Sequence, residues 1–239
     1  MPDIRKHRGA HPEDRKLFSE PELPRLQTAV AELSWLLTRN YAMKGALKLV
    51  GDRYALNERQ RLAVSRAACS DESKSHRASR LVGVEELGDQ EVMIDGFNLI
   101  ITVEAALSGG LVMFCRDGCY RDLSSVHGSY RSVEETGRAI QLIGESLGAL
   151  RVGAARWLLD RPISNSGRLA MVIRDTASQR GWPWMVETVF NPDREIVSAR
   201  GIVISSDGPL LDQVDRWTNF NGHLLEKRLA GAWLIDLSC

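Results

Sequence analysis

The sequence predicts an α/β protein in which a helical N-terminal domain, residues 1–88, precedes an α/β domain with a mainly parallel sheet, residues 89–239. Three observations support this prediction. Apolar residues recur at helical spacing near the N-terminus. Short continuous apolar runs alternate with amphipathic stretches from residue 91 onward. The length of 239 residues fits one large domain or two small ones.

The first 88 residues predict three helices. An apolar face with three- and four-residue spacing marks the first of them. The second runs from Met43 to Val50, and Gly51 ends it. Asn57 and Gln60 have the spacing of a capping box for the third, which extends to about residue 69. The apolar face of the first helix consists of Leu23, Leu26, Val30, Leu33, Leu36 and Leu37.

The second and third helices, with the turn between them, have the pattern of a helix-turn-helix. Arg59, Arg61 and Arg66 lie on the last helix, where a recognition helix would meet phosphates, and we expect them to bind nucleic acid. A plain helical bundle whose arginines form a solvated face is the alternative. The polar residues 70–90 are predicted to be a linker or a long connection between helix and sheet.

From residue 91 the pattern is that of buried strands separated by helices. Continuous apolar runs are typical of strands that are covered on both faces, as in a parallel sheet. The expected strands are 92–94, 111–114, 154–159, 186–190, 202–204 and 232–235. The expected helices are 97–107, 133–150 (capped by Ser132 with Glu135), 167–179 and 209–217.

Three of these strands end in an aspartate: Asp95, Asp160 and Asp207. Because the carboxyl ends of parallel strands face one crevice, we expect these carboxylates to converge. Converging carboxylates repel one another and need a cation or a raised pKa. Oxygen ligands without His or Cys favour Mg²⁺ or Mn²⁺, and Asp212 is a fourth candidate ligand. The alternative is that these aspartates only cap the helices that follow.

Around these aspartates the sequence resembles the PIN/NYN-type nuclease domains. Residues 94–98, Ile-Asp-Gly-Phe-Asn, resemble their first-strand motif, and residues 205–207, Ser-Ser-Asp, resemble their later acidic segment. Asp160 is similar to the middle acidic strand end. The resemblance covers about residues 91–220 and implies a three-layer α/β/α domain that cleaves RNA with Mg²⁺ or Mn²⁺. It implies that Asp95, Asp160 and Asp207 are metal ligands and catalytic residues, and Asp212 matches less closely.

The whole chain also resembles a prokaryotic family, carrying a domain of unknown function, that joins a helical N-terminal domain to such a C-terminal domain. The acid found on a helix of many PIN-like domains has no clear counterpart, since Glu104 comes early and Glu135 late.

Further polar residues beside the expected crevice are candidate nucleic-acid contacts. Asn98 is placed to orient a carboxylate or to touch a phosphate. The segment Ser164, Asn165 and Ser166 precedes a helix, so its amides and hydroxyls are candidates to bind a phosphate. Arg161 and Arg168 flank this segment and are expected to pair with a nucleic-acid backbone.

Composition excludes several classes of protein. Hydrophobic residues make up 44% of the chain, and 31 Lys and Arg balance 31 Asp and Glu. A net charge of zero excludes a histone-like polycation and an acidic disordered chain. The balance is uneven, since residues 1–88 carry +4 and residues 89–239 carry −4. A nucleic-acid partner on a local basic surface is therefore compatible with the total.

No apolar stretch has the length of a secretory signal core or of a membrane span, so we expect a cytoplasmic protein without a membrane partner. P-loop, dinucleotide-binding and serine-hydrolase motifs are absent from the sequence. The sequence thus favours a metal-dependent phosphodiesterase or ribonuclease. It leaves open a non-catalytic module that binds RNA or protein, a phosphohydrolase of small substrates, and a homodimer.

Overall fold

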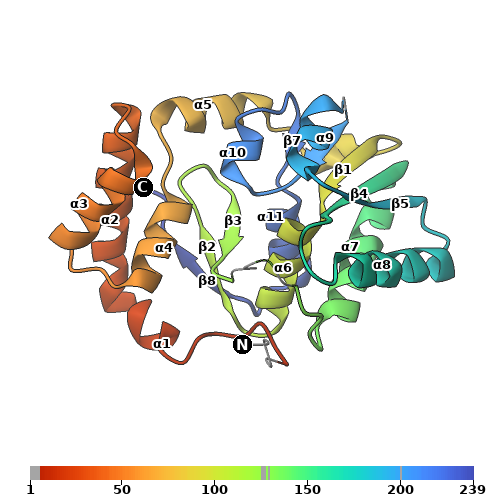
Figure 1. The fold of residues 1–239 in the computed structure, drawn as a ribbon, viewed down its shortest axis with the longest axis horizontal. Coiled ribbons are helices and arrows are strands. Elements are labelled where there is room, and N and C mark those ends of the chain that lie inside the picture. The colour runs from red at the N-terminus through yellow and green to blue at the C-terminus, as the bar shows by residue number, and fades with distance from the viewer. Residues whose placement is uncertain (1–5, 125–127, 129, 200) are drawn as a thin grey trace.

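The computed structural model describes residues 6–124, 128, 130–199 and 201–239, and it has the predicted α/β class (Figure 1). Its helices are α1 (Asp14–Leu17), α2 (Leu23–Thr38), α3 (Met43–Arg53), α4 (Glu58–Ala67), α5 (Asp71–Arg80), α6 (Gly96–Leu107), α7 (Thr136–Ala149), α8 (Ser166–Arg180), α9 (Pro192–Ser198), α10 (Gly208–Leu211) and α11 (Phe220–Arg228). Short 3-10 turns lie at Glu20–Glu22 and Val84–Leu87. Within the described residues, no helix combines the length and apolar character needed to cross a membrane.

The strands are β1 (Glu91–Asp95), β2 (Leu111–Phe114), β3 (Tyr120–Asp122), β4 (Ala154–Asp160), β5 (Trp184–Val189), β6 (Ile202–Ile204), β7 (Trp217–Thr218) and β8 (Trp233–Asp236). Five of them form a parallel sheet in the order β5-β4-β1-β6-β7. The remaining strands form a small sheet in the order β3-β2-β8.

Helices cover both faces of the parallel sheet, as the continuous apolar runs predict. Val92 and Ile94 of β1 pack in one core with α6, α7, α8 and α11. Met93, which points to the opposite face, packs in a second core with α9 and α10. Because successive strand residues face opposite sides, all three must be apolar, and all three are buried.

The small sheet corrects the predicted roles of residues 111–114 and 232–235. Both segments are strands, but they pair with each other as β2 and β8 and not with the main sheet. Their neighbour β3, which pairs with β2, lies in a charged segment that has no apolar run, so no hydrophobic pattern predicted it. Leu111 and Met113 of β2 instead pack against the N-terminal helices.

The N-terminal helices share one hydrophobic core with the small sheet. Leu26 and Leu33 of α2 and Val64 of α4 belong to the same buried cluster as Met113 and Ile235. The Asn57–Gln60 capping box at the start of α4 is present as predicted. The three helices α2, α3 and α4 contact one another, and α4 also contacts β2. A helix-turn-helix that binds nucleic acid stays a prediction.

Residues 70–90, predicted as a linker or a long connection between helix and sheet, contain a helix, α5, and the 3-10 turn Val84–Leu87. Ser70 caps this helix by accepting a hydrogen bond from the amide of Ser73. The helix is strongly polar, and one of its arginines, Arg77, is buried. It runs from the helical region to the neighbourhood of α10 (Figure 1). Its fold depends on charge pairing, which a hydrophobicity pattern does not register.

Arg77 and Arg121 form a buried ion network with the carboxylate of Asp117. Both arginines bond to Asp117 at 2.6 Å, and its side chain is fully buried. Arg77 also binds Asp212 through two nitrogens at 2.7 Å each. Gly208 makes room for this guanidinium, since a Cβ there would lie 2.9 Å from two of its nitrogens. Although burial opposes it, Arg121 and Arg77 lower the pKa of Asp117 to about 2.

Other boundaries differ from the predictions. Helix α7 begins at Thr136, so the Ser132–Glu135 cap does not form. The predicted helix 209–217 is the short α10 followed by β7. Helices α9 and α11 were not predicted, because each begins in a short stretch with mixed polarity.

We expect Arg77→Met to destabilise the protein by about 3–5 kcal/mol, because it leaves a buried carboxylate without one of its two cations. Urea denaturation at neutral pH measures this loss. Arg80→Met on the same helix is the matched control: Arg80 pairs with Asp215, whose side chain is 96% exposed, so this variant should change little. Equal effects of the two substitutions would contradict the structural role of the network.

Candidate functional site

The site lies where the main sheet reverses its strand order. Strand β1 has β4 on one side and β6 on the other, so the chain winds in both directions away from β1. In open parallel sheets, ligands bind outside the carboxyl ends of the strands at such a point. Asp95 ends β1, and Asp207 lies three residues beyond β6. These two aspartates therefore flank the crevice that the topology creates.

The capping alternative does not explain these two carboxylates. Asp95 precedes α6 and Asp207 precedes α10, each at the N-cap position. Neither side chain makes a capping hydrogen bond. The start of α6 lies close to β4, since a Cβ on Gly96 would stand 3.0 Å from the carbonyl oxygen of Leu158. The glycine after Asp95 is thus required by this close approach.

Two serines fix the turn between β6 and α10. The hydroxyl of Ser205 donates to Oδ2 of Asp95 at 2.8 Å and accepts from the amide of Asp207 at 3.0 Å. The amide and hydroxyl of Ser206 both donate to Oδ1 of Asn98, at 2.8 and 2.9 Å. Asn98, predicted to touch a carboxylate or a phosphate, therefore holds the loop that carries Asp207.

Asp193 is a fourth acidic residue at this edge, and it was not among the predicted site residues. It lies in the first turn of α9, shortly after β5. Its charge raises the pKa of Asp95, of Asp160 and of Asp207. An Asn-Pro-Asp segment after an expected strand was the available signal, but the aspartate is not adjacent to the strand end.

Burial raises the pKa of Asp95 to about 7, and the charges of Asp207 and Asp193 act in the same direction against the Ser205 hydrogen bond. Burial also raises the pKa of Asp207, with Asp193 adding to it and Arg121 and Arg77 opposing. For Asp160 the causes are burial and then Asp193. The surroundings of all three carboxylates therefore disfavour the charged form relative to an ordinary aspartate.

The chemistry of these donors fits a hard divalent cation. Within the described residues, the carboxylates of Asp160, Asp193 and Asp207 have no hydrogen-bond or ion-pair partner. In that same part of the chain, no three acidic, His or Cys groups lie close enough together to hold a metal ion as they stand. Mg²⁺ commonly uses one or two carboxylates and keeps several waters. Asp95 and Asp207 are the pair that fits best, because they flank the crevice and the charge of Asp207 raises the pKa of Asp95.

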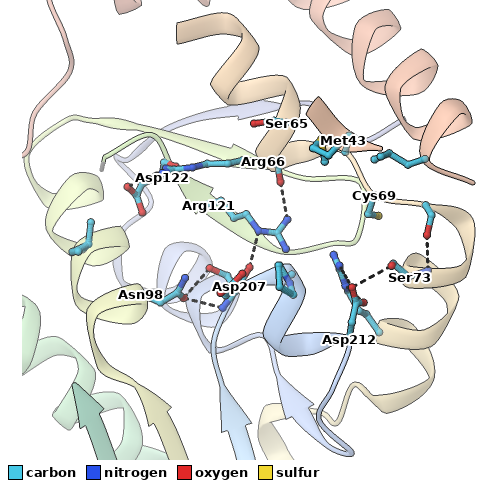
Figure 2. Close-up of a pocket in the computed structure, with 18 of the residues that line it drawn as sticks. Met43, Ser65, Arg66, Cys69, Ser73, Asn98, Arg121, Asp122, Asp207 and Asp212 are labelled. Carbon is cyan, nitrogen blue, oxygen red and sulfur yellow. Dashed lines mark hydrogen bonds and ion pairs between the residues drawn. The ribbon is translucent and has the colours of Figure 1, made fainter. Parts of the chain in front are cut away.

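A cavity of about 640 Å³ opens beside Asp207, between the N-terminal helices and the carboxyl edge of the sheet. Figure 2 shows Asp207 and Asn98 on one side of this cavity, with Arg66 and Met43 on the helical side. Arg121 lies between them and donates to the carbonyl oxygen of Ser206 at 2.6 Å. The cavity is large enough for a small organic ligand or one nucleotide.

Asp212 lines the far side of this cavity, where it is held by other residues (Figure 2). Its two oxygens accept hydrogen bonds from Arg77, and Ser73 donates to one of them at 3.2 Å. The predicted fourth metal ligand is therefore part of the ion network. Glu104 is likewise engaged, in a buried cluster with Arg8, Tyr130 and Thr136.

The segment from Ser164 to Ser166 is bonded mainly within the protein. Ser164 makes backbone hydrogen bonds to residues 128 and 130, and the side-chain nitrogen Nδ2 of Asn165 donates to the carbonyl oxygen of Tyr130 at 2.8 Å. The hydroxyl of Ser166 donates to the carbonyl oxygen of Arg161 at 3.3 Å. Arg168 is exposed in the first turn of α8. Phosphate contacts by this segment, Arg161 and Arg168 stay predictions.

The arginines predicted on the third N-terminal helix all have partners inside the protein. Arg59 binds Asp14 through two nitrogens, and Arg61 binds Asp52 at 2.7 Å. Arg66 donates to the carbonyl oxygens of Asp122 and Ser124 at 2.6 and 2.9 Å. Arg66 alone of the three lines the cavity beside Asp207. Nucleic-acid binding by Arg59 and Arg61 would compete with these ion pairs.

Comparisons with known proteins cover most of the chain. A family model described as "Domain of unknown function (DUF5616)" matches residues 84–223, and one described as "Protein of unknown function (DUF434)" matches residues 25–80. "Uncharacterized protein MJ0935" of Methanocaldococcus jannaschii is 30% identical over 186 residues, which cover 78% of this chain and 88% of the relative. No solved structure matches the chain. A PIN or NYN nuclease family is not shown by these comparisons.

We expect Asp95→Asn to stabilise the metal-free protein at pH 8. The folded protein keeps a proton on Asp95 up to about pH 7, whereas the unfolded chain releases it near pH 4. Stability of the unsubstituted protein therefore falls as the pH rises between these values, and asparagine removes this loss. Thermal unfolding in EDTA should show a higher Tm for the variant at pH 8 and a smaller gap at pH 5. The exposed Asp215→Asn is the control, and a gap independent of pH would contradict the raised pKa.

Proposed function

The chain belongs to the family described as "Domain of unknown function (DUF5616)", and for this member we propose a metal-dependent phosphodiesterase that cleaves RNA. One observation carries the proposal. Asp95 and Asp207 flank the reversal point of a parallel sheet, neither side chain caps the helix that follows it, and the charge of Asp207 adds to burial in raising the pKa of Asp95. Such a pair is costly to keep without a cation.

In this proposal Asp95 and Asp207 hold Mg²⁺ or Mn²⁺, while Asp160 and Asp193 lie in the surrounding layer. A bound divalent cation polarises a phosphoryl oxygen and lowers the pKa of water. Ser205 orients Asp95 through its 2.8 Å hydrogen bond, and it also bonds the amide of Asp207. Burial and the charge of Asp193 raise the pKa of Asp160, so this unpartnered carboxylate is a better proton acceptor than an ordinary aspartate.

The cavity between the N-terminal helices and the sheet has both polar and apolar lining residues, which suits a substrate that has a charged part and an apolar part. It lies next to Asp207 and is lined on the other side by Arg66, Met43 and Leu37. Arg121 and Arg77 place positive charge near Asp207, where they lower its pKa. A phosphodiester with an attached base would find a polar floor and a partly apolar wall there.

A second candidate function is a non-catalytic module that binds RNA or protein. The observation that favours it is the engagement of Glu104: the acid on α6 is bonded to Arg8, Tyr130 and Thr136 and does not join the aspartates. Glu104 is then unavailable as the helix acid that many PIN-like domains carry, and a domain without this acid is expected to bind RNA or protein without cleaving RNA. Calorimetric titration with Mn²⁺ near neutral pH separates the two candidates, because the module requires no metal.

We expect Asp95→Asn to abolish Mn²⁺-dependent cleavage of RNA and to weaken Mn²⁺ binding, because it removes one of two ligands. Asp207→Asn should behave alike. Asp215→Asn, a substitution of an exposed aspartate outside the crevice, should keep the activity. Cleavage is measured on labelled RNA and binding by calorimetry. Unchanged cleavage in Asp95→Asn would overturn the assignment, and absence of Mn²⁺ binding in the unsubstituted protein would favour the module.

A further inference from the structure

An exposed aromatic ring lies at the outer end of the acidic edge. Phe190 directly follows β5, the edge strand of the main sheet (Figure 1). It is 73% exposed, the largest fraction among the large hydrophobic residues that the structure describes. The residue before it, Val189, is paired in register with Asp160. Asp193 follows three residues after Phe190. The ring therefore stands beside two of the four aspartates.

A cation lies over this ring. The Cζ atom of Arg161 is 4.9 Å from the ring centroid of Phe190. The amide of Arg161 donates to the carbonyl oxygen of Val189 at 2.7 Å, which fixes the two backbones next to each other. Within the described residues the guanidinium of Arg161 has no carboxylate partner. Arg161 therefore differs from Arg59 and Arg77, each of which forms an ion pair with an aspartate.

We propose that Phe190 and Arg161 form a stacking platform for a base of single-stranded RNA at this edge of the site. An exposed ring stacks with any base, and an arginine at the same place adds cation–π and phosphate contacts. Duplex RNA keeps its base faces inside the stack, so the platform selects unpaired nucleotides. The inference rests on the proposed function, because it identifies the substrate class of the same site.

The platform and the cavity lie on opposite sides of Asp95. The platform follows β5, and the cavity lies beside Asp207 after β6, with β4 and β1 between them. Three interstrand spacings separate β5 from β6, which amounts to about 14 Å. A short single strand that stacks on Phe190 can therefore cross Asp160 and Asp95 before it reaches the cavity. This path brings a backbone phosphate past the carboxylates.

The experiment measures binding of a short fluorescent oligouridine to the full chain in EDTA, where cleavage is absent, by fluorescence anisotropy. We expect Phe190→Ala to weaken binding about 5- to 150-fold, the range found for loss of one stacked base. Phe190→Trp should restore it. Phe190 is on the surface, so thermal unfolding should show that both variants stay folded.

Trp35→Ala is the matched control. Trp35 is 55% exposed and has Arg39 over its ring at 3.6 Å, but it lies on α2 and does not line the site. This variant should bind oligouridine as the unsubstituted protein does. Binding of a hairpin-free RNA duplex should be insensitive to Phe190→Ala.

Unchanged oligouridine binding in Phe190→Ala, or an equal loss in Trp35→Ala, would overturn the platform. A change of sedimentation in Phe190→Ala without a change in RNA binding would also overturn it, since the ring would then belong to an interface between copies. These outcomes are separate from the Mn²⁺ measurements. If Phe190→Ala weakens RNA binding but the protein binds no Mn²⁺, the platform stands and the nuclease proposal fails. If Phe190→Ala binds oligouridine as tightly as the unsubstituted protein and still cleaves RNA with Mn²⁺, the nuclease proposal stands and the platform fails.

Discussion

The buried carboxylate of Asp117 determines how the parts of this protein fit together. It lies between Arg77 and Arg121, and these three residues come from α5, the β2–β3 turn and β3. Arg77 continues the network to Asp212 beyond α10, and Arg121 continues it to the carbonyl oxygen of Ser206. The same network thus joins the N-terminal helices, the small sheet and the loop that carries Asp207. A buried carboxylate needs such cations, so none of these three elements can move independently.

The buried carboxylate at the carboxyl edge of the main sheet has the opposite electrostatic surroundings from Asp117. Asp117 has two cations and a pKa lowered to about 2, whereas Asp95 has none and a pKa raised to about 7. Both carboxylates are desolvated, so the difference comes from their neighbours. The protein thus pairs the buried carboxylate of Asp117 with two arginines, but among the described residues it gives the buried carboxylate of Asp95, beside the crevice, no cationic partner. This contrast is the physical basis for proposing a cation at Asp95 and Asp207.

The net charge of zero is the sum of an acidic excess near the site and a basic excess in the N-terminal residues. The acidic excess of residues 89–239 lies partly in the aspartates at the strand ends, and three arginines of residues 1–88 are paired with acidic residues of that half: Arg8 with Glu104, Arg77 with Asp117 and Arg80 with Asp215. The basic half therefore offers less free charge than its +4 suggests. Unneutralised positive charge next to the site comes instead from Arg161, in the acidic half, beside the exposed ring of Phe190.

The sequence by itself determined the α/β class, most strand positions in the main sheet, the capping box at Asn57 and the aspartates Asp95, Asp160 and Asp207. These features are local, because apolar periodicity and a residue that directly follows a strand are visible along the chain. Tertiary structure alone decided that β2 and β8 leave the main sheet, that residues 70–90 contain the helix α5, and that Asp212 pairs with Arg77. It also added Asp193, which reaches the site through the position of α9. Pairing between charges and strands far apart in sequence depends on partners that no local pattern identifies.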